Sequence, residues 1–172
     1  KQARNETEFV WLRGICGPIV YSMGASDLIE AGFLVRPKIR FVRYEAPWID
    51  GTSWSQLLYG KLVVNCDERN ARILEEAIHY ALRGKRVLID VSRVEHADVL
   101  YSLFKNIAPP TLQGRCQVLI GSTKDAARKR VIQRFKAGER PVLISTVMGE
   151  GVDVPELEVV INAEGGKAHT ST

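Results

Sequence analysis

The chain has 172 residues, of which 45% are hydrophobic and 26% charged, and 24 Lys and Arg against 20 Asp and Glu give a net charge of +4. This composition is that of a globular protein long enough to bury a core in one domain with an extra piece. No apolar run approaches the roughly 18 residues of a membrane span, no signal peptide is evident, and the mildly basic charge permits a polyanionic partner without requiring one.

Residues 1–63 are the less regular part of the sequence. GPIVYSM (17–23) and KIRFVRY (38–44) have the apolar and β-branched character of strands, and SDLIEAG (26–32) has that of a short helix between them. The stretch therefore predicts a linker or edge segment that joins a more regular domain near residue 37.

From about residue 64 onward, predicted strands and helices alternate. NCDERNARILEEAIHYALRGK (65–85) has apolar residues at helical spacing, with Asn65 and Glu68 as a capping pair and Gly84 at the C-cap. The helices that follow are predicted at residues 92–106 and 122–139, and the apolar strands at 86–91, 117–121, 141–146 and 158–162. Strands separated by helices of this length imply right-handed parallel crossovers, so the sequence predicts an α/β fold.

Two of these crossovers carry the same polar pattern. Ser92 with Glu95 and Ser122 with Asp125 both match [ST]-x-x-[DE], the capping box that opens a helix. In a parallel sheet both helix N-termini then open at the same edge, which suits phosphate groups. Ser92, Gly121 and Ser122 would add hydroxyl and backbone donors, although the caps taken alone favour two well-capped helices without a ligand.

The loop after the third regular strand adds a third feature at that edge. Thr146 ends the strand with a hydroxyl, Gly149 and Gly151 let the backbone approach a ligand, and Asp153 stands just before Pro155. An aspartate in this position can accept a hydrogen bond from a ribose hydroxyl or orient an arginine. It can also cap its own turn, and the spacing leaves both interpretations open.

Other charged and metal-ligating residues are less specific. The helix at 122–139 is strongly basic, which is typical of a solvated face and only weakly indicates a nucleic-acid surface without interleaved aromatic residues. The three cysteines and three histidines show no ligand spacing, so we expect no metal site, histidines on the surface or on a helix face, and a reducing, cytoplasmic compartment. The members of these two sets are Cys16, Cys66, Cys116, His79, His96 and His169.

Four stretches together resemble superfamily 2 helicases. PVLISTVMGEGVDVPELEVVI (141–161) resembles their fifth motif, in which a strand and a Thr or Ser precede G-x-D-x-P, and RVLIDVSRVEHADVL (86–100) is similar to the fourth. GSTKDAARKRVIQRFKAGERPVLIST (121–146) is similar to the segment between them. GPIVYSMGASDLIEAGFLVRPKI (17–39) resembles the stretch that leads out of the first lobe in phage and bacterial members related to excision-repair and restriction-type motors.

This resemblance implies a RecA-like three-layer α/β sandwich with a mainly parallel sheet, the second motor lobe of an ATP-dependent helicase or translocase. Residues 1–36 would be the trailing segment of the first lobe or a linker, and residues 37–172 the second lobe. The implied partners are nucleic acid, with DNA expected ahead of RNA, and the first RecA-like lobe of the same chain. ATP and Mg²⁺ are the implied cofactors of the full-length parent, with hydrolysis between the lobes.

The resemblance also implies roles for single residues. By their place in the fifth motif, Thr146 and Ser145 would hold a phosphate of the bound strand. Gly151 and Asp153 would face the ATP ribose and an arginine finger. The rest of the implied nucleic-acid track consists of Ser92, Arg93, Gly121 and Ser122.

The departures from the family pattern set the limits of these expectations. The chain lacks the P-loop and the D-E-x-x motif, and it stops at Thr172, before the place of the sixth motif, Q-x-x-G-R-x-x-R, which supplies the arginine finger. We therefore expect a piece of a longer protein that has no catalytic residue and no tightly bound cofactor, and that hydrolyses no ATP alone. A restriction-type motor that tracks along duplex and a non-catalytic RecA-like binding module remain as alternatives.

Overall fold

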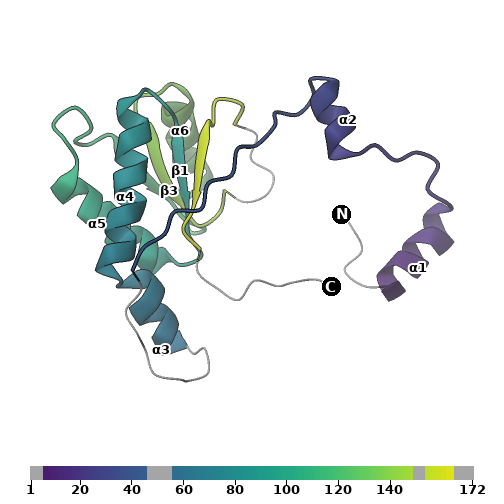
Figure 1. The fold of residues 1–172 in the computed structure, drawn as a ribbon, viewed down its shortest axis with the longest axis horizontal. Helices are drawn as coiled ribbons and strands as arrows, with labels where there is room; N and C mark the ends of the chain where they lie inside the picture. Colours follow the sequence, from purple (N-terminus) through teal and green to yellow (C-terminus); the bar gives the residue numbers. More distant parts are fainter. Residues whose placement is uncertain (1–5, 46–55, 149–153, 165–172) are drawn as a thin grey trace. The chain divides into compact units, whose positions relative to one another are not determined.

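A computed structural model of the chain describes residues 6–45, 56–148 and 154–164 (Figure 1). By its internal contacts the chain divides into two compact units, residues 1–41 and 42–172. The assignment of the first residues to a preceding lobe stays a prediction. No helix in the described ranges combines the length and apolar character needed to cross a membrane.

The first unit contains α1 (Glu6–Cys16) and α2 (Ala25–Glu30). α2 confirms the predicted short helix, whereas α1 is a helix that sequence reasoning missed. The strands predicted at 17–23 and 38–44 are wrong, because neither stretch has regular structure. Val20 is 94% exposed and Phe41 91% exposed, so these β-prone residues pair with no neighbouring strand that would hold them in a sheet.

The second unit is built on a sheet of four parallel strands, β1 (Val87–Asp90), β2 (Cys116–Leu119), β3 (Val142–Ser145) and β4 (Val159–Asn162). Their order in the sheet is β2-β3-β1-β4, with β1 and β3 in the middle. All four strands confirm predicted ones.

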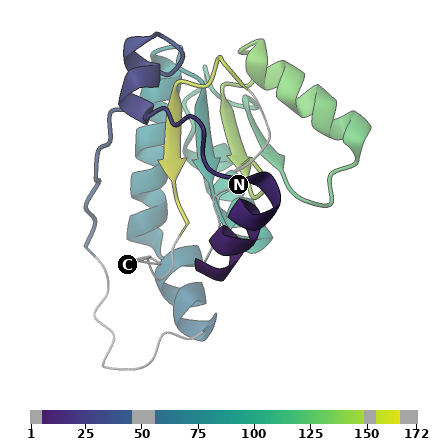
Figure 2. The same cartoon turned by 90° about the vertical axis from the view of Figure 1, so that its right-hand side faces the viewer.

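Helices cover both faces of this sheet. α4 (Asp67–Leu82) and α5 (Val94–Ile107) pack on one face, where Leu74 and Leu100 are completely buried. α6 (Asp125–Lys136) packs on the other, where Phe135 is completely buried (Figure 2). Along β1 and β3, successive buried side chains belong alternately to the core under α4 and α5 and to the core under α6. This arrangement confirms the predicted three-layer α/β sandwich of RecA-like type.

The starts of the helices differ from the predicted capping boxes. The N-cap residues of α5 and α6 are Arg93 and Lys124, and neither makes a side-chain cap hydrogen bond. Before α6 the chain forms a tight turn, in which Ile120 N–H donates to Thr123 Oγ1 and Thr123 N–H donates to Ile120 O. Ser122 lies within this turn, so the serine predicted as the N-cap lies outside the helix.

The predicted cap of α4 at Asn65 is wrong for a similar reason. α3 (Gln56–Tyr59) runs into the π-helical turn η1 (Gly60–Val64), and Asn65 N–H donates to Gly60 O and so closes that turn. α4 then begins after Cys66, one residue later than predicted. At the other end of α4, the predicted glycine stop is correct, because Gly84 has a φ of +79°.

Candidate nucleic-acid interface

The carboxyl ends of the four parallel strands meet at one edge of the sheet. In the register of the strands, Asp90 of β1 lies beside Ser145 of β3 and Asn162 of β4, and Leu119 of β2 lies beside Ser145. We call this row and the residues that directly follow it the carboxyl edge. α5 and α6 both begin at this edge, so their positive dipole ends and first N–H groups open there.

The structure brings four of the predicted track residues to the carboxyl edge with access to solvent. Ser92, Gly121 and Ser122 are exposed, and Thr146 is half-buried. A Cβ built on Gly121 would meet only Val147 Cγ1, at 3.7 Å, an ordinary van der Waals distance. Packing therefore does not require glycine at this position, and contact of Gly121 with a phosphate stays a prediction.

Ser145 differs from these residues because it is fully buried. Its Oγ donates to Leu119 O at 3.0 Å and accepts from Val147 N–H at 3.1 Å, while Thr146 N–H donates to Leu119 O at 3.1 Å. The serine thus ties the ends of β2 and β3 together and sets the turn that carries Thr146. Its assignment as a phosphate ligand stays a prediction, and its observed contacts orient the neighbouring threonine.

Arg93 is also engaged with the protein. Its guanidinium lies over the ring of Tyr59, 4.1 Å from the centroid, at the point where α3 packs beside the start of α5. Such a cation–π contact holds the side chain against the protein. Contact of Arg93 with a phosphate stays a prediction.

The β1 and β4 half of the carboxyl edge is acidic. Burial raises the pKa of the Asp90 carboxyl, and the nearby Glu164 raises it further, while a hydrogen bond from Val91 N–H lowers it. Burial disfavours the charged form and Glu164 repels a second negative charge, so these two effects oppose added negative charge here. A phosphate is therefore better accommodated on the β2 and β3 half, where Gly121, Ser122 and Thr146 lie.

A buried polar network beneath this edge was missed by sequence reasoning. Arg69 of α4 is only 9% exposed, and its Nη2 donates to Ala163 O at 2.8 Å and Glu164 O at 3.1 Å. Its Nη1 donates to Val63 O at 3.4 Å. One guanidinium thus joins η1 to the point at which the chain leaves β4.

The next residue of α4 extends the network to α5. Asn70 Nδ2 donates to Val64 O at 2.8 Å, which turns Asn70 Oδ1 towards His96 Nε2 at 2.9 Å. His96 is completely buried on the inner face of α5, so of the two expected places it takes a helix face, whereas His79 is exposed. Burial, and to a smaller extent the Arg69 guanidinium, lower the pKa of His96 to about 4.

The nucleotide side of the predicted site cannot be placed. Gly149, Gly151 and Asp153 lie outside the described residues, and so does His169. In the ranges that are described, no three His, Cys, Asp or Glu side chains gather as a metal site would require.

Comparisons with known proteins bear on the family of this chain. A family model described as the helicase conserved C-terminal domain matches residues 69–171. The chain is 27% identical over 148 residues to irc3 of Schizosaccharomyces pombe, a candidate mitochondrial ATP-dependent helicase, with 83% of this chain and 24% of that protein covered. It is 27% identical over 105 residues to the ATP-dependent RNA helicase DBP5 of Debaryomyces hansenii, with 59% of this chain and 20% of that protein covered.

Among solved structures, the helicase domain of Hef from Pyrococcus furiosus aligns with 57% of this chain and 20% of that chain, at 22% identity and a TM-score of 0.48. The chain thus spans about a quarter of the length of the relatives named above, or less. Because the family match extends over more than half of its 172 residues, the chain belongs to the helicase conserved C-terminal domain family.

Proposed function

We propose that this chain is the second motor lobe of an ATP-dependent helicase or translocase, of the type related to excision-repair and restriction-type motors, and that its carboxyl edge binds backbone phosphates. The observation that carries the proposal is the gathering of Ser92, Gly121, Ser122 and Thr146 at the edge where α5 and α6 begin. Open α/β sheets bind their ligands at this edge, and helix N-termini favour anions.

The chemistry of these donors suits a strand read without regard to its sequence. Hydroxyl groups and backbone N–H groups donate to phosphate oxygens, and such contacts fix the register of a strand while carrying no base information. Ser145 would contribute indirectly, because its two internal hydrogen bonds hold the turn that carries Thr146. The main contacts would lie on the β2 and β3 half, at Gly121, Ser122 and Thr146, and Ser92 would contact the strand where it passes the start of α5.

Hydrolysis of ATP would require a second lobe. Gly151 and Asp153, in the loop between β3 and β4, are proposed to face the ATP ribose and an arginine finger, while the P-loop and the Mg²⁺ ligands come from the first RecA-like lobe of the parent chain. The isolated chain is then expected to hydrolyse no ATP and to hold no nucleotide tightly. The names of the relatives include a mitochondrial protein and an RNA helicase, so a cytoplasmic location and DNA as the partner stay predictions.

The phosphate contacts are tested by substitution in the chain itself. Thr146→Ala and Ser122→Ala each remove one hydrogen bond to a charged group, worth about 1.5–3 kcal/mol, so Kd should rise roughly 10- to 100-fold. Fluorescence anisotropy with single-stranded DNA and RNA of unrelated sequences measures this change. Ser102→Ala, at an exposed serine two turns into α5, is the matched control and should bind as the parent does.

The rise in Kd should be the same for every sequence, because the contacts are to the backbone. An unchanged affinity in both edge variants would show that no phosphate lies at Thr146 and Ser122. A loss confined to one sequence would indicate contact with bases, which the proposal does not allow.

The nucleotide half is tested separately, in the full-length parent. Asp153→Asn keeps a good turn residue but loses the charge-assisted hydrogen bond, so ATP turnover should fall by roughly one to two decades. Binding of nucleic acid without nucleotide should hardly change. Near-normal turnover in a folded variant would leave Asp153 as a turn residue only.

A further inference from the structure

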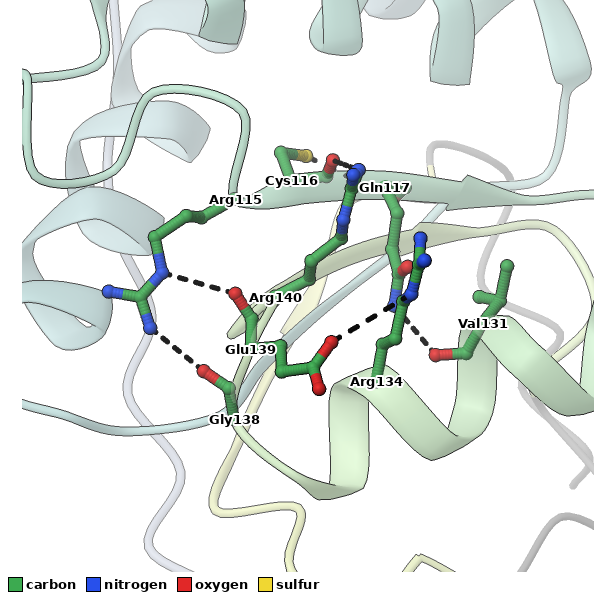
Figure 3. Close-up of polar contacts among 8 residues, drawn as sticks. All are labelled: Arg115, Cys116, Gln117, Val131, Arg134, Gly138, Glu139 and Arg140. Atoms are coloured by element: carbon green, nitrogen blue, oxygen red, sulfur yellow. Dashed lines mark hydrogen bonds and ion pairs between the residues drawn. The ribbon is translucent and has the colours of Figure 1, made fainter.

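A cluster of arginines covers the outer surface of α6 and the turn that follows it. Arg130 and Arg134 are exposed and lie one helical turn apart on α6, Arg115 is exposed and precedes β2, and Arg140 is half-buried and precedes β3. We call these four residues the α6 basic surface. Figure 3 shows three of them around the end of α6.

Two of these arginines are held in place by backbone carbonyls. Arg115 Nη2 donates to Gly138 O at 2.8 Å and its Nε to Glu139 O at 3.1 Å, while Arg140 Nη1 donates to Cys116 O at 3.2 Å (Figure 3). The Arg115 bonds lie at the negative end of α6, whereas the Arg140 bond holds the start of β2. A guanidinium has five N–H donors, so each of these side chains still has donors to offer in a fixed orientation.

The charge of the α6 basic surface is poorly balanced. The ion pair found within it joins Arg134 Nε to Glu139 Oε2 at 3.8 Å, between side chains that are 53% and 64% exposed. Such exposed pairs are weak and are readily replaced by another anion. α6 itself carries one acidic residue, Asp125, which lies at its other end.

The surface also lacks the features of a protein-binding site. Across the described part of residues 108–159 no large hydrophobic side chain is exposed. Protein interfaces are anchored by buried aromatic and aliphatic residues, whereas nucleic-acid interfaces are polar and strongly basic. Guanidinium groups, moreover, match the geometry of phosphate oxygens.

The position of α6 connects this surface to the carboxyl edge. The helix has 12 residues, about 18 Å, and it runs from the carboxyl edge beside Ser122 to the amino ends of β2 and β3. That length corresponds to roughly five phosphates along one strand of a B-form duplex. We propose that the α6 basic surface is a second contact for the nucleic-acid backbone, which continues along α6 the path that starts at the carboxyl edge.

This inference rests on the proposed function, and salt dependence tests it. The double variant Arg130→Gln with Arg134→Gln removes two charges and leaves in place Arg115 and Arg140, which bond backbone carbonyls. Its matched control, Arg72→Gln with Arg83→Gln, removes two exposed charges from α4 and from its C-cap, on the other face of the sheet. Kd for a DNA duplex and for single-stranded DNA and RNA is measured for each form of the chain between 50 and 200 mM salt.

Two lost phosphate contacts should lower the slope of log K against log salt by about 1.8 for duplex DNA and about 1.4 for single strands. Over this fourfold range of salt, duplex affinity should then fall about tenfold less in the α6 variant than in the parent. The α4 control should keep the slope of the parent. Equal changes in the two double variants would mean that only overall charge matters and would overturn the inference.

The remaining outcomes separate this inference from the proposed function. If Thr146→Ala weakens binding and the α6 variant does not, the carboxyl edge stands and the second contact is wrong. If the α6 variant binds more weakly and Thr146→Ala does not, the contact at the α6 basic surface stands and the proposed phosphate contact at Thr146 is wrong. If the α6 variant loses binding to poly-L-glutamate but keeps its affinity for nucleic acid, the partner is an acidic protein segment and the inference fails.

Discussion

The two edges of the sheet use the same chemistry in opposite surroundings. At the carboxyl edge, Arg69 donates to the carbonyls of Ala163 and Glu164 while only 9% exposed. At the amino edge, Arg115 donates to the carbonyls of Gly138 and Glu139 while exposed to water. In both places a guanidinium satisfies carbonyl groups where a strand or helix ends, but only one of the two arginines can also meet a partner.

Burial decides what each arginine contributes. A buried carbonyl that loses its donor has no water to replace it, so the cost of removing Arg69 falls on the stability of the fold. The carbonyls beside Arg115 can turn to solvent, so its removal should cost little. The carboxyl edge therefore presents backbone N–H groups and short hydroxyl side chains above a buried polar network, whereas the amino edge presents long charged side chains.

The largest expected effect is that of Arg69→Met. The substitution keeps the apolar stem and leaves the carbonyls of Val63, Ala163 and Glu164 without their donor, so the free energy of unfolding should fall by about 3–4 kcal/mol. Arg115→Met is the control at the other edge and should cost less than about 1 kcal/mol. Urea unfolding followed by circular dichroism measures both, and equal losses would remove the contrast between the edges.

The next effect is a dependence of stability on pH through His96. Its pKa is lowered to about 4 in the fold, chiefly by burial, and lies near 6.5 in an unfolded chain. As the pH falls through 6.5 the unfolded state takes up the proton first, so the free energy of unfolding should fall by about 2–3 kcal/mol by pH 4 and change little below.

Urea unfolding at several pH values between 7 and 4 checks this expectation. His96→Gln keeps an amide N–H that can donate to Asn70 Oδ1 but has no group that titrates in this range. Its unfolding free energy should therefore change much less with pH than that of the parent. The same decrease in both proteins would assign it to other groups.

The regular half of the fold was predictable because its pattern is local. Apolar runs such as 141–146 and the helical spacing within 65–85 specify the strands and helices directly, and Gly84 marks a helix end for a backbone reason. The shared edge of Ser92, Ser122 and Thr146 followed from parallel topology alone. These residues needed no knowledge of distant contacts.

The rest depends on partners that are remote in sequence. Arg69 and Asn70 lie in a polar stretch that is typical of an exposed helix start, and only the approach of β4 and α5 buries them. The capping box at Ser122 failed because the turn at Ile120 and Thr123 shifts the start of α6. The strands predicted in the first unit failed because β-propensity needs a neighbouring strand.

The smallest effects contrast two glycines, one at each edge. Gly138 ends α6 with a φ of +74°, a conformation that L residues rarely adopt, so Gly138→Ala should cost about 1–2 kcal/mol in unfolding free energy. Gly121 has no positive φ, and an added Cβ would make only an ordinary contact with Val147, so Gly121→Ala should lie within about 1 kcal/mol of the parent and tend to stabilise the fold.

Binding to nucleic acid should rank these two variants the other way round. Gly138→Ala leaves the carboxyl edge unchanged, so its Kd at a temperature where it is folded should equal that of the parent. Gly121→Ala puts a methyl group where the backbone is proposed to approach a phosphate, so its Kd should rise although its fold is intact. If Gly121→Ala is stable and binds as the parent does, the backbone at this position does not touch the strand, and the hydroxyls of Ser122 and Thr146 must account for binding on that half of the edge.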